Sequence, residues 1–240
     1  GWIAQAQAPV ILCQRSDPEG RAGAALADLA LRHAIAVCEP FSVRNVLPGL
    51  HPMLIGHDPR RALEQADLVI VLDSGVPWIE SLGRPGEGVR VCHIGPDPAF
   101  RRMPVRGYRG DLAIACDPAL ALLALAAALP SPDAATYARR ERIAAQSAQR
   151  RATTDTLAAE GADASPMSAE WLSRCLSDAM DDSAVIFNEL GALPPFMRAR
   201  GPNRIFSNPH SGGLGWALPA ALGAQLADRD RLTIACVGDG

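Results

Sequence analysis

Between Pro9 and Leu129 the sequence alternates short apolar runs with stretches of helical periodicity, and this alternation constrains the fold more than any other feature. Continuous apolar runs are typical of strands covered on both faces, and strands separated by helices are typical of a parallel sheet. The sequence therefore predicts an α/β fold with a Rossmann-like first domain. Its strands are expected at residues 10–13, 35–38, 68–72, 89–94 and 112–115, and its helices include 21–32 and 118–129.

A Pro130-Ser131-Pro132 break ends this pattern. The stretch that follows, up to Glu160, is rich in alanine, arginine and glutamine but has little apolar content, which favours a solvated helical connector. Ser168 begins a further helix, and a second set of strands is expected at 184–188, 204–207 and 232–237, with a helix at 216–227. We predict a Rossmann-like domain over residues 1–130, a helical connector over 131–166 and the truncated beginning of a second α/β domain over 167–240.

The overall composition narrows the class of partner. The formal net charge is −3 and the pI is near 6.0, so the overall charge favours neither nucleic acid nor an anionic membrane surface as a partner. No apolar run approaches the ~20 residues needed to cross a bilayer, since even the alanine- and leucine-rich stretch 118–129 is too short. A small soluble molecule is the partner that the composition favours.

The six cysteines show no CxxC pair and no histidine at zinc-finger spacing, which argues against a metal site made of cysteines. Five of them lie in short β-prone runs such as 10–13 and 234–237. In such runs a thiol packs as a small buried hydrophobe. We therefore expect reduced cysteines and a cytoplasmic location.

Two short segments near the end of the sequence carry candidate chemistry. The stretch 211–215 is rich in glycine and precedes an expected helix, where missing side chains let the backbone approach a ligand. Taken alone, such a turn is also typical of loops without a ligand. Asp239 stands between Gly238 and Gly240, directly after an expected strand. This places a carboxylate at the carboxyl edge of a sheet, where α/β folds bind ligands and a hard cation would accept an oxygen ligand.

These segments resemble the cofactor motifs of thiamine-diphosphate enzymes in the acetolactate synthase, benzoylformate decarboxylase and pyruvate oxidase group. Residues 212–223, GGLGWALPAALG, match the family's GGxG..LPAA.G segment, and residues 238–240, GDG, match the opening of its magnesium-diphosphate motif. Benzoylformate decarboxylase and its close relatives look nearest. The first half of the chain is similar to the family's middle domain, in the His51-Pro52 and Gly56 pattern, at 66–69 and at Asp97-Pro98. The resemblance implies that middle domain, followed by part of the cofactor-binding domain.

The resemblance also implies roles for the matching residues. Asp239 is expected to coordinate Mg²⁺, which bridges the two phosphates of the cofactor. Gly238 and Gly240 are expected to keep that loop tight. The backbone around Gly212, with Gly213 beside it, is expected to accept a hydrogen bond from the aminopyrimidine of the cofactor.

Three further positions belong to the implied site. Leu214 is expected under the bent cofactor, bringing its amino group against the thiazolium carbon, while core packing is the alternative for Leu214 and Trp216. Gly191 aligns with a segment that reaches the diphosphate, but residues 190–193 replace the hydroxyl and amide side chains of relatives, so contacts there must come from backbone N–H groups. His210 is a candidate for contacting a substrate carboxylate or moving a proton, and a merely solvated loop histidine is the alternative.

The implied cofactors are thiamine diphosphate and Mg²⁺, and the implied substrate is a small 2-oxo acid. The reaction would be decarboxylation, or the joining of the resulting carbanion to a second carbonyl. A homodimer or homotetramer with active sites at subunit interfaces is the implied assembly. FAD is not supported by the sequence, because the first strand-to-helix turn, from Cys13 to Gly20, lacks the GxGxxG spacing.

The remaining magnesium ligands and the pyrimidine-binding domain, with its activating glutamate, are expected outside this chain. We therefore expect the residues to be a segment of a longer polypeptide that is inactive by itself. Two alternatives stay open. The first is a non-catalytic Rossmann-like nucleotide-binding or regulatory module in which the glycine stretch is only a turn. The second is a family member that has lost activity, which the altered segment 190–193 keeps open.

Overall fold

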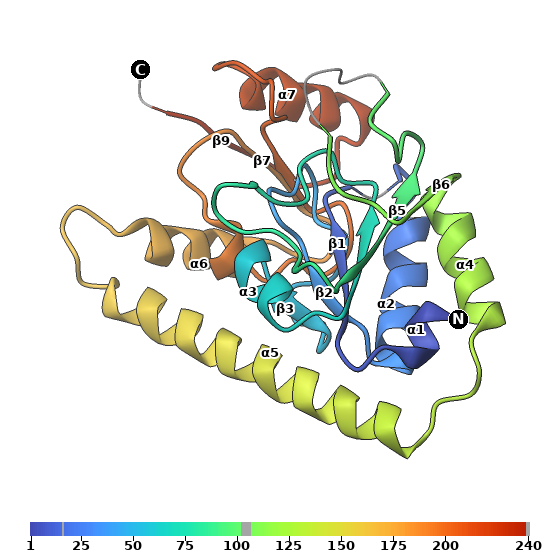
Figure 1. Cartoon of the computed structure of the whole chain (residues 1–240). Coiled ribbons are helices and arrows are strands. Elements are labelled where there is room, and N and C mark those ends of the chain that lie inside the picture. Colours follow the sequence, from blue (N-terminus) through green and yellow to red (C-terminus); the bar gives the residue numbers. More distant parts are fainter. Residues whose placement is uncertain (16, 102–106, 239–240) are drawn as a thin grey trace.

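The computed structural model describes residues 1–15, 17–101 and 107–238 (Figure 1). Its larger unit, called the first unit below, is built on a parallel sheet in the order β3-β2-β1-β4-β5-β6, and the second unit is built on the smaller sheet that follows in the sequence. The strands are β1 Pro9–Cys13, β2 Ala36–Cys38, β3 Leu54–Gly56, β4 Leu68–Leu72, β5 Arg90–Gly95 and β6 Leu112–Ala115, and the helices are α1 Trp2–Gln5, α2 Arg21–His33, α3 Pro59–Glu64 and α4 Pro118–Ala128. The chain builds outward from β1 to β3 and restarts at β4 beside β1, which is the Rossmann order with its switch point between β1 and β4.

The predicted fold class is confirmed, and each expected strand is present with shifts of about one residue at some ends. Strands β1 and β4 are buried along their whole length, which is why their apolar runs are uninterrupted. The sequence did not predict β3. That strand has three residues, ends at Gly56 and pairs with β2 across a register shift, so it is too short to produce a recognisable pattern.

Two helix starts that are capped by a side chain were predicted, at Asp117 and Ser168, whereas α3, which Asp58 caps, was not predicted. The Asp117 carboxylate accepts hydrogen bonds from two backbone N–H groups in the first turn of α4. Ser168 Oγ accepts a hydrogen bond from Trp171 N where α6 Ala169–Ala179 begins. Such caps satisfy N–H groups that have no partner inside the helix, so they are readable from local sequence.

The expected connector is one long helix, α5 Ala134–Glu160, which also packs on the first sheet. It runs past the edge strand β3 (Figure 1), and Ser147 Oγ donates a 2.7 Å hydrogen bond to the carbonyl of Leu54. Arg139 donates to backbone carbonyls at the end of α2 and in the turn before β1. The prediction of a solvated connector was therefore incomplete, because the packed face uses polar and small side chains. Neither α5 nor any other helix in the described ranges is long and apolar enough to cross a membrane.

The second sheet is also parallel, in the order β8-β7-β9. Its strands are β7 Val185–Asn188, β8 Ile205–Ser207 and β9 Thr233–Cys236, and helix α7 Ala217–Ala227 and the 3-10 turn η1 Pro194–Phe196 accompany them. Helix α7 packs on the sheet through Ala217 and Ala221. The stacked rings of Phe187 and Phe206, 4.9 Å apart, belong to the same cluster.

One amide side chain joins the first unit to the second sheet. Asn45 Oδ1 accepts hydrogen bonds of 2.8 Å from the backbone N–H groups of Arg204 and Ile205 at the start of β8. Its Nδ2 donates to the carbonyls of Leu47 and Gly201, at 3.0 and 2.7 Å. The residue is 6% exposed, so both polar atoms of its side chain are paired out of reach of most water. Asn45 therefore fixes the position of β8 against the first unit.

Replacing Asn45 with alanine is expected to lower the free energy of unfolding by about 2–4 kcal/mol, because buried backbone donors and carbonyls lose their partners. Asn203→Gly is the matched control, since it removes two hydrogen bonds from a half-buried amide and glycine tolerates the φ of +56° there, and a smaller loss is expected. Urea unfolding followed by circular dichroism measures both. Equal losses for the two variants would contradict a special role for Asn45.

A buried carboxyl group follows β2 and holds the loop that carries Asn45. Glu39 is 1% exposed, and its Oε1 accepts hydrogen bonds from Val46 N at 3.0 Å and Leu47 N at 2.7 Å. Burial raises the pKa of Glu39 to about 7, although these hydrogen bonds act in the opposite direction. The folded protein therefore keeps Glu39 protonated at mildly acidic pH.

The titration of Glu39 predicts a pH-dependent stability. Between pH 4.5, the ordinary pKa of a glutamate, and about pH 7, the folded protein holds a proton on Glu39 that the unfolded chain has released. The contribution of Glu39 to the free energy of unfolding is therefore full below pH 4.5 and is lost as the pH rises through 7. Glu39→Gln removes the titration. Relative to the unmodified protein, the variant is expected to gain on the order of 2–3 kcal/mol in free energy of unfolding between pH 5 and pH 8. Parallel pH profiles from urea unfolding would sink this prediction.

Candidate cofactor site

Three chain segments meet at the carboxyl edge of the second sheet. They are residues 188–193 after β7, residues 208–216 between β8 and α7, and residues 237–238 after β9. Because the strands are parallel, all three segments leave the sheet on the same side (Figure 1). Backbone hydrogen bonds join them, from Asn208 N to Asn188 O at 3.1 Å and from Glu189 N to Cys236 O at 2.9 Å. This is the edge at which α/β sheets bind ligands.

The loop after β7 is closed by the side chain of Asn188. Its amide donates to Ala192 O at 2.8 Å and accepts from Ala192 N at 3.1 Å, while Leu193 N donates to a hydroxyl group on α6. Gly191 lies within this loop with φ of +100°, a conformation that side chains rarely adopt. Of the backbone N–H groups over 190–193, only that of Gly191 lacks a partner among the described residues. Of the backbone N–H groups that were predicted to contact the diphosphate, that of Gly191 is therefore the one without a partner among the described residues.

Glu189 organises the glycine-rich loop from across the sheet edge. Its carboxylate accepts hydrogen bonds from Gly215 N at 2.8 Å and Ala217 N at 2.9 Å, where α7 begins. The hydrogen bonds from Ala217 and Gly215 hold the pKa of Glu189 below its usual range. The sequence placed Glu189 in the segment 188–191 that is expected to reach the diphosphate, and it did not predict that this residue holds the glycine-rich loop. The available signal was a carboxylate directly after a buried strand, but its partners lie 26 and 28 positions away, beyond any local pattern.

Gly212 is required by close packing inside the loop. A Cβ at this position would come within 2 Å of Asn208 Oδ1, closer than any two such atoms can lie. Gly212 N also donates a 2.7 Å hydrogen bond to Pro209 O, which closes a tight turn. Gly213 has nothing within 4 Å of the position a Cβ would take, and Gly215 has φ of +86°. The loop therefore needs glycine at 212 for space and at 215 for backbone conformation.

The two apolar residues of the motif lie in different surroundings. Leu214 is 81% exposed, so core packing is the wrong interpretation for this side chain in the described chain. Trp216 is half-buried, and its ring lies 6.0 Å from that of Phe187 in the core of the second sheet. Only Trp216 follows the core-packing alternative. Leu214 is left with its apolar surface facing outward beside the glycines.

Gly238 lies against the segment that follows β7. A Cβ built on Gly238 would be 3.4 Å from Leu190 Cδ1, so the start of the GDG motif reaches the same edge as the glycine-rich loop. Asp239 and Gly240, predicted as the metal ligand and its flanking glycine, lie outside the described residues. The magnesium role of Asp239 stays a prediction.

His210 contacts the first unit. Its Nε2 lies 3.3 Å from Oε1 of Gln14, the residue that follows β1. Gln14 is fully buried, donates to the carbonyls of Pro40 and Val76, and accepts from the N–H groups of Gly75 and Val76. This one amide ties together the turns after β1, β2 and β4, and the sequence did not indicate it. The catalytic role of His210 and the expectation about FAD both stay predictions.

Comparison with known proteins identifies the family. Residues 1–125 match the model of the central domain of thiamine pyrophosphate enzymes, and residues 190–240 match the model of their C-terminal thiamine pyrophosphate-binding domain. The first match spans more than half of the chain. The chain belongs to the thiamine pyrophosphate enzyme family, as its motifs predicted.

Solved structures agree with this assignment at the level of the fold. A Mycobacterium smegmatis protein assigned as a thiamin diphosphate-dependent enzyme matches with a TM-score of 0.72 at 22% identity. Benzoylformate decarboxylase from Polynucleobacter necessarius matches with a TM-score of 0.71 at 20% identity. Both matches cover 100% of this chain, but only 46% and 45% of the two relatives. The chain thus spans less than half the length of these relatives.

Gly212→Ala is expected to displace the loop over residues 208–216, because its Cβ cannot coexist with the present position of Asn208 Oδ1. Gly213→Ala is the matched control, since open space surrounds that position. Hydrogen exchange of the loop amides is expected to rise at least ~10-fold in the first variant and to change little in the second. Similar exchange in both variants would contradict the packing argument.

Proposed function

We propose that this chain forms part of a thiamine-diphosphate- and Mg²⁺-dependent enzyme that decarboxylates a 2-oxo acid or transfers the resulting carbanion to a second carbonyl. The observation that carries the proposal is the glycine-rich loop at the carboxyl edge of the second sheet, which excludes a side chain at Gly212 and is held by Glu189. Family membership supports the cofactor. The match of residues 212–223 to the motif of benzoylformate decarboxylase and its relatives supports the class of substrate.

Unpaired polar groups at this edge fit a diphosphate cofactor with an amino-substituted ring. Asn208 Oδ1 is a buried acceptor without a hydrogen-bond partner among the described residues. Gly191 N–H, on an exposed residue, is a donor without a hydrogen-bond partner among the described residues. A phosphate oxygen can accept from the second group and a ring amine can donate to the first. Because a buried polar atom without a partner is unfavourable, a ligand that supplies these contacts gains affinity.

Each residue of the proposed site has a separate task. Gly191 N–H binds a phosphate oxygen, and Gly212 and Gly213 let the backbone approach the cofactor rings. Leu214 supplies the apolar surface beneath them, and Asp239 with its flanking glycines holds Mg²⁺. When bound, thiamine diphosphate supplies the electron sink that stabilises the carbanion left by loss of CO₂. His210, positioned through Gln14, binds the substrate carboxylate or moves a proton.

The outer face of α7 supports an active site that further protein covers. Leu218, Leu222 and Leu226 on this helix are 54%, 58% and 70% exposed. A helix that is apolar on the outside as well as the inside is typical of one packed on both faces. We propose that another domain or a second subunit covers it, in a cytoplasmic homodimer or homotetramer with the cofactor at the interface.

Binding of thiamine diphosphate to the intact protein tests the proposal. Calorimetry with and without Mg²⁺ is expected to show metal-dependent binding, and Asp239→Ala is expected to weaken it at least about 10-fold by removing a metal ligand. Asp230→Ala, which removes an exposed carboxylate near the same strand, is the matched control and is expected to bind normally.

If the unmodified protein ignores thiamine diphosphate, the enzyme proposal is wrong and a non-catalytic role is favoured. If it binds the cofactor without Mg²⁺ and regardless of Asp239, the metal assignment alone is wrong. Metal-dependent binding justifies a screen of 2-oxo acids for CO₂ release, which separates an active enzyme from an inactive family member.

A further inference from the structure

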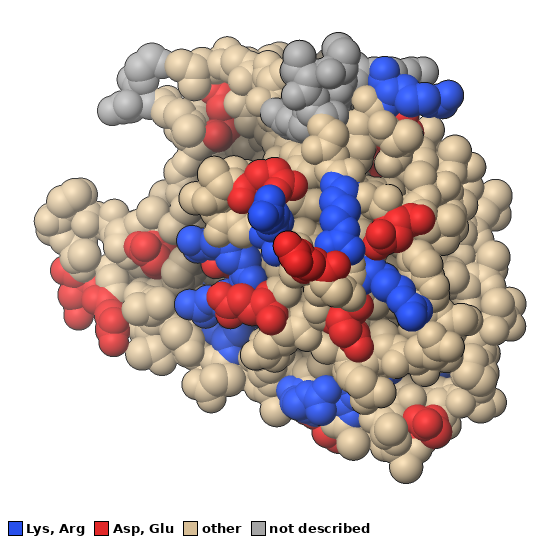
Figure 2. Space-filling model, in the orientation of Figure 1, with Lys and Arg blue, Asp and Glu red and all other residues tan. Residues whose placement is uncertain are grey.

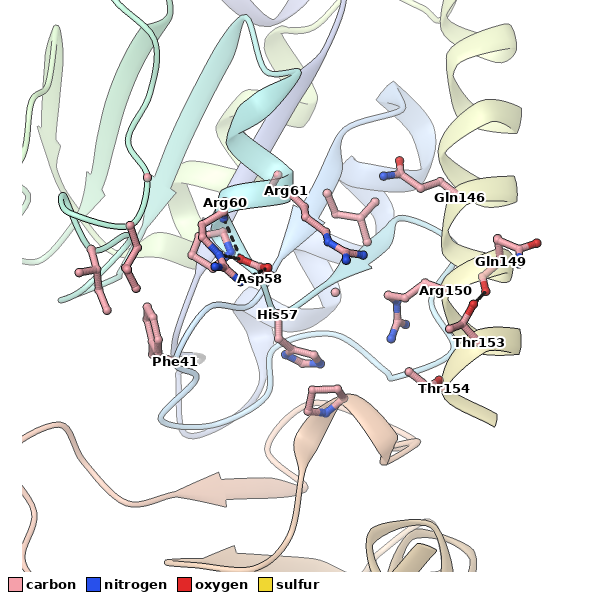
Figure 3. A pocket seen from close by; sticks show the side chains of 18 of the residues that line it. Phe41, His57, Asp58, Arg60, Arg61, Gln146, Gln149, Arg150, Thr153 and Thr154 are labelled. Carbon is pink, nitrogen blue, oxygen red and sulfur yellow. Dashed lines mark hydrogen bonds and ion pairs between the residues drawn. The ribbon is translucent and has the colours of Figure 1, made fainter. Parts of the chain in front are cut away.

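A cavity of about 870 Å³ lies in the first unit, between α3, α5 and the turns after β2 and β4 (Figure 3). The segment from Gly56 to Arg61 after β3 lines its floor, and Pro195 of η1 borders it from the second unit. A volume of this size accommodates a small metabolite. The cavity does not include any residue of the proposed cofactor site.

Two guanidinium groups that form no ion pair among the described residues face this cavity. Arg61 extends from α3 and Arg150 from α5, and both point into the space between the helices (Figure 3). Arg150 Nε is buried and has no hydrogen-bond partner in the described parts of the chain. Burial lowers the pKa of Arg150, the neighbouring Arg151 acts in the same direction, and Asp155 partly opposes them. Since an arginine stays protonated in proteins, an anionic ligand in the cavity is a suitable partner for this group.

The third arginine of the cavity, Arg60, differs from Arg61 and Arg150 because a carboxylate pairs with it. Arg60 forms a two-pronged pair with Asp58, from Nε to Oδ1 at 3.0 Å and from Nη2 to Oδ2 at 2.8 Å. Its charge is therefore balanced within the protein. Arg61 and Arg150 form no ion pair with any described carboxylate, so the cavity keeps a local positive charge. Figure 2 shows basic side chains gathered over α3 and the facing part of α5, interleaved with acidic ones.

The backbone of β3 makes room for Arg150. Gly56 has φ of +129°, and a Cβ placed there would be 3.0 Å from Arg150 Cδ. A side chain at position 56 would therefore crowd the arginine and would also strain the backbone. Glycine at the end of this edge strand lets the Arg150 side chain lie across it toward the cavity.

Large exposed apolar side chains also line the cavity. Phe41, Ile79 and Leu82 lie in the turns after β2 and β4, and Leu157 lies on α5 with Arg150; they are 44%, 38%, 60% and 48% exposed. Phe41 also has φ of +50°, which is unusual for a bulky residue and is the kind of strain that is found at ligand sites. Large apolar side chains beside unpaired cations suit a ligand that has an anionic head and an apolar body.

We propose that this cavity binds an organic phosphate monoester, with its phosphate between Arg61 and Arg150 and its apolar body against Phe41 and Leu82. A phosphate carries close to two charges near neutral pH and offers enough oxygens for two guanidinium forks, whereas a carboxylate offers two oxygens and one charge. The ligand would touch Pro195, which lies in the second unit between Glu189 and β8.

Titration calorimetry of the intact protein with phenyl phosphate, in the absence of thiamine diphosphate and Mg²⁺, tests this proposal. One molecule is expected to bind per chain, and Arg61→Gln and Arg150→Gln are each expected to weaken binding about 10-fold or more. Arg140→Gln on the same helix α5, outside the cavity lining, is the matched control and is expected to leave the affinity unchanged. Inorganic phosphate and phenylacetate are both expected to bind at least about 10-fold more weakly than phenyl phosphate.

Phe41→Ala is a second variant that leaves both arginines in place. It is expected to weaken phenyl phosphate binding and to leave the weaker binding of inorganic phosphate unchanged. The proposal is overturned if phenyl phosphate does not bind at millimolar concentration, if both arginine variants bind it normally, or if Arg140→Gln weakens it equally. Loss of phenyl phosphate binding in Asp239→Ala would also overturn it, because the ligand would then occupy the proposed cofactor site. Since the titration uses no cofactor, its outcome is independent of the proposed function.

Discussion

Asn45 is the residue on which the relative placement of the two sheets most depends, because its backbone pairs with Asn203 and Ile205 and its side chain adds further hydrogen bonds. Its amide both donates and accepts across the boundary, and it does so at the start of β8. Glu39 holds the same loop from the other side, through the N–H groups of Val46 and Leu47. The end of β2 is thereby linked to β8 through buried hydrogen bonds. Such contacts are directional, so they set one arrangement where apolar packing alone would allow several.

The hydrogen bonds between the Asn45 loop and β8 also determine where the candidate cofactor site lies relative to the first unit. Strand β8 pairs with β7, and β7 pairs with β9, so the segments that leave these strands converge at one edge. Glu189 and Asn208 then shape the glycine-rich loop from within the second unit. Gln14 adds a contact from the first unit to His210. The site is therefore built from both units, although the domain boundaries predicted at residues 130 and 166 remain a prediction.

Helix α5 packs on the first unit and also carries Arg150 to the cavity. Its polar contacts, through Arg139 and Ser147, fasten it to carbonyl groups of the first unit, which a purely apolar stripe could not satisfy. The same attachment carries Arg150 to the end of β3, opposite Arg61. Positive side chains thus outnumber negative ones in a cavity that large apolar side chains also line. Large apolar side chains exposed beside unpaired cations suit a ligand with an anionic head and an apolar body.

Local sequence was sufficient for the elements and for the family. Uninterrupted apolar runs at β1 and β4 indicated strands that are buried on both faces. Asp117 and Ser168 indicated where helices begin, and the glycine-rich and GDG motifs indicated the family. Each of these signals is contained within a few neighbouring residues. Strand β3 was missed because three residues ending in glycine carry no periodicity.

Tertiary structure alone decided which distant groups meet. Glu189 receives the N–H groups of α7, Gln14 reaches His210, Asn208 forbids a side chain at Gly212, and Arg150 lies opposite Arg61. Most of these pairs are separated by tens of residues or more, so no periodicity or spacing encodes them. They arise because parallel strands gather their following loops at one edge, and because buried polar groups must find partners wherever the fold brings them. The sequence by itself determined which residue types were available at that edge, and the packing of the sheets determined which of them touch.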